Sequence, residues 1–74
     1  MKKKYTYTTT NDFTTGYEWI VFHLHYSNVC FRFTFDNYKE SIKSIWLSPE
    51  QAYDYLREHQ FLGYEFTITK RIAI

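Results

Sequence analysis

The chain is poor in residues that cross-link or interrupt a fold. Its 74 residues include one cysteine, one proline and two glycines. A single cysteine excludes an internal disulfide and is typical of proteins that fold in a reducing compartment. So little glycine and proline also argues against a disordered, low-complexity chain. We therefore expect residues 1–74 to form one small domain.

The sequence also lacks an excess of charge and a long apolar run. Nine basic and eight acidic residues leave a net charge of +1, whereas a domain that binds nucleic acid by bulk electrostatics is clearly basic. No segment reaches the roughly 20 apolar residues that a membrane-spanning helix needs. The basic segment 1–4 is followed by tyrosine and threonine, unlike a signal peptide. These absences predict a soluble, cytoplasmic protein without a membrane partner.

Aromatic residues are abundant, at 23% of the chain, and with threonine they favour β-structure. Alternating patterns predict an edge strand at 4–10 and further strands at 17–26, 29–35, 42–47 and 64–72, with a turn-rich loop at 11–16. One helix is predicted from Pro49 to about His59 or Gln60, because Ser48 and Gln51 form a capping box and Gly63 can end it. The predicted fold is α+β, a mainly antiparallel sheet with one helix packed on one face, in the order β-β-β-β-α-β.

Segments 17–26 and 29–35 are predicted to form a hairpin that turns at Ser27 and Asn28. The register with alternating faces pairs Phe22 with Phe33 in the core and His25 with Cys30 on the opposite face, because a slip of one residue would exchange the faces. That opposite face would lack a helix to cover it, and its composition is typical of protein interfaces. We therefore expect a homodimer. Its predicted interface residues are Trp19, Val21, His23 and His25.

The candidate metal ligands and nucleophile gather in the same hairpin. His23, His25 and Cys30 are residue types that zinc accepts, but a flat strand pair beside Arg32 makes a poor cage for a cation. A Cys30–His25 dyad would lack a third, orienting group. The sequence thus predicts no metal, no cofactor, no catalytic residue and no enzyme activity.

A nucleic-acid alternative stays open. The spacing Phe31-x-Phe33-x-Phe35 is similar to the aromatic strand of RNA-recognition motifs, on which bases stack. Those domains have glycine near the aromatic residues and the order β-α-β-β-α-β with two helices, neither of which is predicted here. The alternative is a single-strand-binding protein that uses Trp19, Arg32 and the terminal lysines. An open sheet face bordered by Lys and Arg would favour nucleic acid, and a face closed by a second subunit would favour a protein target.

The predicted helix carries Glu50, Asp54 and Glu58 at i, i+4 and i+8 on its outer face. Like charges at this spacing slightly destabilise a helix. The column is either a solvated surface or a ridge that binds a basic target, and both interpretations remain open.

In size, in its aromatic and threonine content and in the display of Glu50, Asp54 and Glu58, the chain resembles small phage-encoded proteins that disable a host enzyme. It is similar to inhibitors of the DNA sliding clamp and to DNA-mimic inhibitors, although DNA mimics are strongly acidic and this chain is nearly neutral. The resemblance implies a non-enzymatic inhibitor in the host cytoplasm. It would bind a basic, DNA-handling host protein of the replication machinery through these three acids and block access of DNA.

Overall fold

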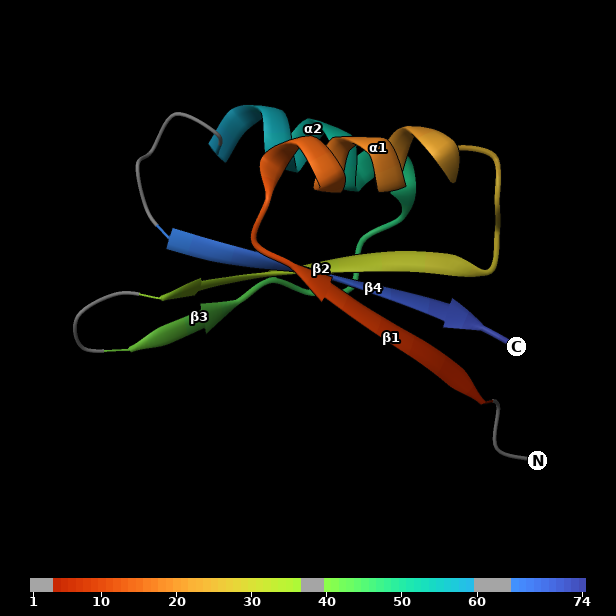
Figure 1. Ribbon diagram of the computed structural model, residues 1–74, viewed down its shortest axis with the longest axis horizontal. Helices are drawn as coiled ribbons and strands as arrows, with labels where there is room; N and C mark the ends of the chain where they lie inside the picture. Colours follow the sequence, from red (N-terminus) through yellow and green to blue (C-terminus); the bar gives the residue numbers. More distant parts are fainter. Residues whose placement is uncertain (1–3, 37–39, 60–64) are drawn as a thin grey trace.

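The computed structural model describes residues 4–36, 40–59 and 65–74. A four-stranded sheet carries both helices on one face (Figure 1). The element order is β-α-β-β-α-β. The elements are β1 (Tyr5–Thr10), α1 (Phe13–Phe22), β2 (Val29–Asp36), β3 (Ser41–Lys43), α2 (Pro49–His59) and β4 (Glu65–Ala73).

The strands lie in the order β1-β4-β2-β3, and every neighbouring pair is antiparallel. Strand β4 is therefore central although it comes last in sequence. Each helix joins two parallel strands that flank a third. Helix α1 leads from β1 to β2 across β4, and α2 leads from β3 to β4 across β2. This arrangement leaves β1 and β3 as the two edges of the sheet.

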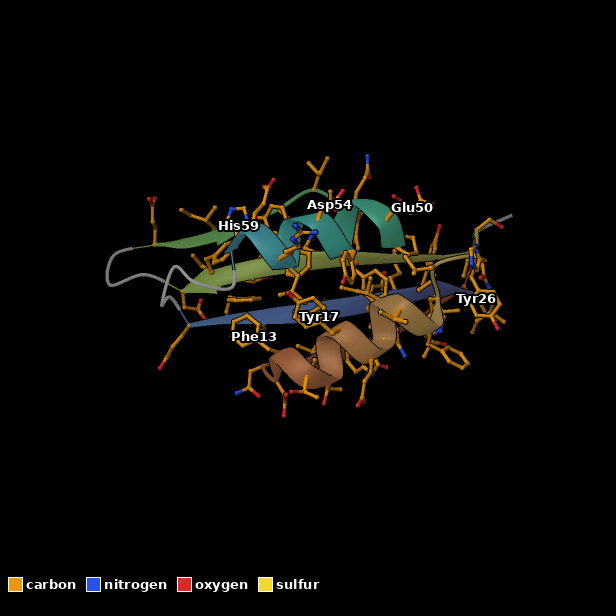
Figure 2. All side chains as sticks on the ribbon, turned by 90° about the horizontal axis from the view of Figure 1, so that it is seen from above. Phe13, Tyr17, Tyr26, Glu50, Asp54 and His59 are labelled. Carbon is orange, nitrogen blue, oxygen red and sulfur yellow. The ribbon has the colours of Figure 1, made fainter. Side chains whose placement is uncertain are left out.

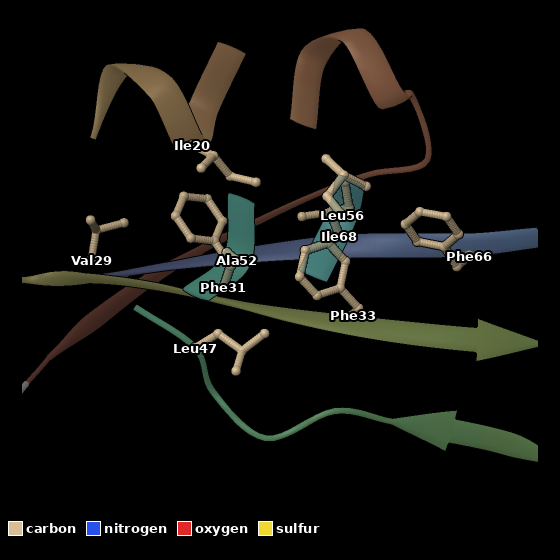
Figure 3. Packing of buried hydrophobic residues seen from close by; sticks show 9 residues of the cluster. All are labelled: Ile20, Val29, Phe31, Phe33, Leu47, Ala52, Leu56, Phe66 and Ile68. Carbon is tan, nitrogen blue, oxygen red and sulfur yellow. The ribbon is translucent and has the colours of Figure 1, made fainter. Parts of the chain in front are cut away.

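The hydrophobic core lies between the helices and the sheet (Figure 3). Phe31 and Phe33 of β2 alternate toward the helices and are fully buried, as are Ile68 of β4 and Leu56 of α2. Burying side chains of this size contributes about 1.5–3 kcal/mol each, an upper estimate because unfolded chains already bury part of their surface. The core comprises Ile20, Val29, Phe31, Phe33, Leu47, Ala52, Leu56, Phe66 and Ile68.

Helix α1 begins where the sequence pattern predicted a loop. The Oδ1 atom of Asp12 accepts hydrogen bonds from the backbone N–H groups of Thr14 at 2.8 Å and Thr15 at 3.3 Å. These bonds satisfy two of the N–H groups that lack a partner at a helix start. The helix buries Gly16 and Ile20. Because Gly16 has no side chain, α1 lies directly against Ile68 of the sheet.

The predicted one-helix order and the predicted hairpin are therefore wrong. The segment 17–26 is not a strand, because it forms most of α1 and the turn that follows. The actual partner of Phe33 is Ile68 on β4, and that of Cys30 is Arg71. Phe22, predicted to be in the core, is 71% exposed. The aromatic and β-branched residues of this segment suit a strand, but the Asp12 cap and packing against the sheet favour a helix.

Other predictions are confirmed. The fold is α+β with an antiparallel sheet, and residues 5–10 form an edge strand. Helix α2 begins with the predicted capping box, in which the Ser48 N–H donates to Gln51 Oε1 at 3.1 Å and the Gln51 N–H donates to Ser48 Oγ at 3.3 Å. The predicted fourth strand is shorter than expected, since β3 ends at Lys43. Gly63 lies outside the described residues.

The helices are short, with 10 residues in α1 and 11 in α2. In residues 4–36, 40–59 and 65–74, neither is long or apolar enough to cross a membrane.

Candidate functional site

The sheet face opposite the helices is formed by the alternate residues of each strand. On β2, Phe31 and Phe33 turn toward the helices, so Cys30, Arg32 and Thr34 turn away. Directly paired residues of neighbouring strands lie on the same face, so the residues of β4 and β1 on this face follow from those of β2. The residues on this face include Tyr5, Tyr7 and Thr9 of β1, Cys30, Arg32 and Thr34 of β2, and Thr67, Thr69 and Arg71 of β4.

Trp46 joins this face from the segment between β3 and α2. Leu47 pairs with Phe31 through two backbone hydrogen bonds of 2.8 and 2.9 Å and is buried on the helix side. The preceding residue therefore turns to the opposite face. There the Trp46 ring lies 6.3 Å from the ring of Tyr7, centroid to centroid. The side chain spans the sheet from the β3 side to β1, because β2 and β4 lie between them.

Two arginines pack on this tryptophan. The guanidinium carbons of Arg32 and Arg71 lie 4.5 Å and 4.1 Å from the Trp46 ring centroid. That of Arg71 also lies 4.7 Å from the ring of Tyr5. Cation–π contacts of this kind contribute about 0.5–1 kcal/mol at exposed sites. We call Tyr5, Tyr7, Arg32, Trp46 and Arg71 the open-face cluster.

The positive charges of the cluster are not neutralised by nearby acids. Within the described residues, neither Arg32 nor Arg71 forms an ion pair, and the buried Nε atom of Arg32 has no hydrogen-bond partner. The Nε atom of Arg71 donates to the sulfur of Cys30 at 3.2 Å. Burial lowers the pKa of Arg71, but the hydrogen bond to Cys30, electrostatic interactions with Cys30 and Tyr5 and a hydrogen bond to Tyr7 outweigh burial and raise the pKa overall. The guanidinium group of Arg71 therefore stays charged.

The face is polar along its length and changes sign from one end to the other. At the end remote from the open-face cluster, Asp36 and Glu65 are directly paired. Threonines lie between, and the hydroxyls of Thr9 and Thr69 are 3.4 Å apart. Tyr5 and Tyr7 are 38% and 58% exposed. Within the described residues, the face thus offers aromatic rings, guanidinium groups without an ion pair and hydroxyls on one sheet.

The acidic residues predicted to bind a target lie in the helix layer. Glu50, Asp54 and Glu58 are all exposed on α2, whose inward side is anchored by Ala52 and Leu56. Figure 2 shows Glu50 and Asp54 on α2, with Tyr17 of α1 between the two helices. An open pocket of about 320 Å³ is lined by Leu24, Glu50, Tyr53 and Asp54. Two of the three predicted acids thus border this pocket.

The residues predicted to form the dimer interface do not share a sheet face. Trp19 and Val21 belong to α1, and His23 and His25 follow it. The centroid of the Trp19 ring lies 4.6 Å from Lys70 Nζ, and Val21 is exposed. Because this segment is a helix, Trp19 and Val21 do not point to one face, as alternate residues of a strand would. The exposed aromatic residues near this helix end are instead Phe22 and Tyr26, whose ring centroids are 6.0 Å apart.

The candidate metal ligands are also separated in the fold. Cys30 lies on the open sheet face, whereas His23 is in ring contact with Phe31 on the helix side. Among the described residues, no group of three or more His, Cys, Asp or Glu side chains could hold a metal ion.

Sequence analysis identified Arg32 as a candidate ligand-binding residue but missed the rest of the open-face cluster. The alternation of Tyr5 and Tyr7 with threonine was visible, and it indicated that both rings share one face. Nothing local indicated that Arg71 lies beside them, because the pairing of β1 with β4 joins opposite ends of the sequence. The order β-α-β-β-α-β, which the sequence argued against, is present, although Phe31 and Phe33 face the helices.

No family model matches the chain, and comparisons with curated proteins and with solved structures give no significant match.

Proposed function

We propose that the protein binds single-stranded nucleic acid on the sheet face that carries the open-face cluster. The observation that supports this most is the packing of Arg32 and Arg71 on Trp46, with neither arginine in an ion pair within the described residues. Proteins that bind single strands combine cationic groups, which contact the phosphates, with aromatic rings on which bases stack. Four-stranded sheets that bind RNA stack about two or three bases in this way.

Each part of the cluster has a distinct role in the proposal. Tyr7 and Tyr5 are the more exposed rings and offer surfaces on which bases stack. Trp46 fixes the two guanidinium planes, so little side-chain entropy is lost when they meet a phosphate. The unpaired bases of a single strand can reach this sheet face, whereas the bases of a duplex are stacked inside the double helix. We therefore expect preference for single strands over duplexes.

The number of phosphate contacts determines the expected salt dependence. Two phosphate contacts, one at each arginine, would give a slope of about −1.4 for log K against log salt concentration, since each contact on a single strand contributes about −0.7. Stacking, which is less sensitive to salt, would supply much of the affinity. A much steeper slope would indicate that the terminal lysines carry the binding instead.

The experiment measures fluorescence anisotropy of labelled single strands of about 10 nucleotides, a length in the range of single-domain sites, as RNA and as DNA. Replacing Tyr7 by alanine removes one stacking surface, and about 1–3 kcal/mol per base corresponds to about 5- to 140-fold weaker binding. The matched control is Tyr26→Ala, because Tyr26 is also exposed, at 49% against 58% for Tyr7, but lies beside Phe22 near the end of α1. Equal loss in both variants, or no binding by the wild type, would refute the proposal.

A second candidate function is inhibition of a basic, DNA-handling host protein such as a sliding clamp, in the manner of the phage-encoded inhibitors that the chain resembles. The observation that favours it is the exposure of Glu50, Asp54 and Glu58 on a helix held by buried residues. Charged residues at the rim of an interface mainly determine the association rate and the salt sensitivity of binding. Capture of a host protein by the wild type, lost when all three acids are changed to lysine, would support it. Unchanged capture by that folded variant would exclude the acidic helix face as the binding surface.

A further inference from the structure

Within the described residues, strand β1 pairs only with β4, so its other side is an edge of the sheet. Its six residues are two tyrosines and four threonines, with no charged residue, proline or glycine. The pairing with β4 runs without a bulge from Tyr5 opposite Ala73 to Thr10 opposite Ile68. Edge strands in natural proteins are usually short or carry lysine, proline or a bulge, because these features prevent pairing with another chain. The outer edge of β1 has none of these features and is suited to pairing.

The register identifies the backbone groups that point outward. The Ile74 N–H donates to the Lys4 carbonyl at 2.9 Å, so this pair is a hydrogen-bonded pair of the antiparallel ladder. Such pairs alternate along the ladder. Thr6 and Thr8 therefore bond toward β4, and Tyr5, Tyr7 and Thr9 direct their N–H and C=O groups to the outer edge.

We propose that a second copy of the chain pairs with this edge, β1 against β1, about a two-fold axis at Tyr7. Tyr7 then faces its own equivalent, Tyr5 faces Thr9 of the second copy, and Thr6 faces Thr8 of the second copy. Every outward N–H meets an outward C=O, so three donors from each copy form the interchain ladder. Lys4 falls opposite Thr10, and no like charges meet. The residues of β1 can thus pair with the same residues of a second copy without like charges meeting. This self-complementarity favours a second copy over a strand of another protein.

The dimer has a consequence for the site, which rests on the proposed function. Tyr5 and Tyr7 lie on the open face at the joined edge, so the two open-face clusters would meet across one eight-stranded sheet. Each copy would then contribute two tyrosine rings to a stacking surface about twice as long. The dimer itself does not depend on nucleic acid, and its mass can be measured without any.

The test is the solution mass by light scattering and sedimentation, against 9.1 kDa for one chain. We expect the wild type to be a dimer. Because Thr6 faces Thr8 of the second copy, the double variant Thr6→Lys with Thr8→Lys brings like charges together twice and should be a monomer. The matched variant Thr6→Lys with Thr8→Glu brings opposite charges together in this register and should remain a dimer. Circular dichroism checks that both variants are folded.

Amide hydrogen exchange provides a second measurement that needs no substitution. In the dimer, the N–H groups of Tyr5, Tyr7 and Thr9 should exchange slowly and become faster on dilution. A wild-type monomer at every soluble concentration would overturn the proposal. So would two variants that are both dimeric, which would indicate another surface such as Phe22 and Tyr26. Two folded variants that are both monomeric would overturn the proposed register. None of these results would alter binding of single strands by the open-face cluster of one copy.

Discussion

The close approach of α1 to the sheet at Gly16 makes a quantitative prediction about stability. A β-carbon at Gly16 would collide with Cδ1 of Ile68 and lie 3.7 Å from Cδ2 of Leu56. In Gly16→Ala the helix gains about 1 kcal/mol, because glycine is a poor helix former. Overpacking of a core costs about 1–3 kcal/mol. We therefore expect the substitution to lower the free energy of unfolding by about 0–2 kcal/mol.

The variant Ile68→Val separates the two effects, since it removes the same Cδ1 atom. Alone it should destabilise the fold by about 0.5–1.5 kcal/mol. In the double variant the new methyl group occupies the space left by Cδ1, so the overpacking cost disappears and the helix gain remains. The double variant should therefore be more stable than the sum of the single effects by about 1–3 kcal/mol, which is a coupling expected between contacting residues.

The assay is urea unfolding followed by tryptophan fluorescence and circular dichroism, with all four proteins at one concentration. A change of 1 kcal/mol corresponds to about 4–8 °C in Tm for a domain of this size. Additivity of the two substitutions within about 0.5 kcal/mol would show that Gly16 and Ile68 are not in contact, and would refute the position of α1 against β4.

Two further predictions concern α1 and the aromatic core. Asp12→Ala removes the acceptor of two backbone N–H groups and should cost about 1 kcal/mol in a thermal melt, whereas Asp12→Asn should cost much less. Burial raises the pKa of Tyr55 above 10.0 in the folded protein, so the native state holds its proton at pH values where the unfolded chain loses it. Stability should therefore fall as the pH rises above about 10, and Tyr55→Phe should remove part of that fall. An unchanged pH profile in Tyr55→Phe would contradict the assigned burial.

The sequence predicted the elements whose signals are local. In β2 the alternation of Phe31 and Phe33 with polar residues correctly indicated which side chains enter the core. The start of α2 was predicted correctly because the Ser48–Gln51 capping box is a local device with specific hydrogen bonds. Such features depend on residues a few positions apart, so they can be read without knowledge of the fold.

Helix α1 was missed because its residues suit two periodicities. Tyr17, Trp19 and Val21 alternate as in a strand, and their types favour strands. The helical stripe of Phe13, Gly16, Tyr17 and Ile20 is also present at i, i+3, i+4 and i+7, and it starts directly after the Asp12 cap. Reading Asn11 to Gly16 as a loop hid that stripe. The buried Gly16 in this stripe indicates close packing of the helix only once the sheet beneath the helix is known.

The candidate site could not be predicted for a different reason. Trp46 reaches the open face because Leu47 pairs with Phe31, and Arg71 reaches it because β4 lies between β1 and β2. Both facts concern pairing between distant segments, which periodicity does not encode. The acidic residues of α2 were identified correctly as exposed, since a single helix determines their position.

The central position of β4 has a consequence for how the chain acquires its structure during synthesis. Within the described residues, strand β1 pairs only with β4, and β2 pairs with β4 along its whole length. Until β4 leaves the ribosome, the earlier strands therefore cannot assemble into this sheet, and Phe31 and Phe33 lack the full cover of the folded state. Pairing of segments so distant in sequence slows folding, and exposed strand edges favour aggregation meanwhile. A nascent chain that stops before Glu65 should thus bind chaperones, and release from them should coincide with the appearance of β4.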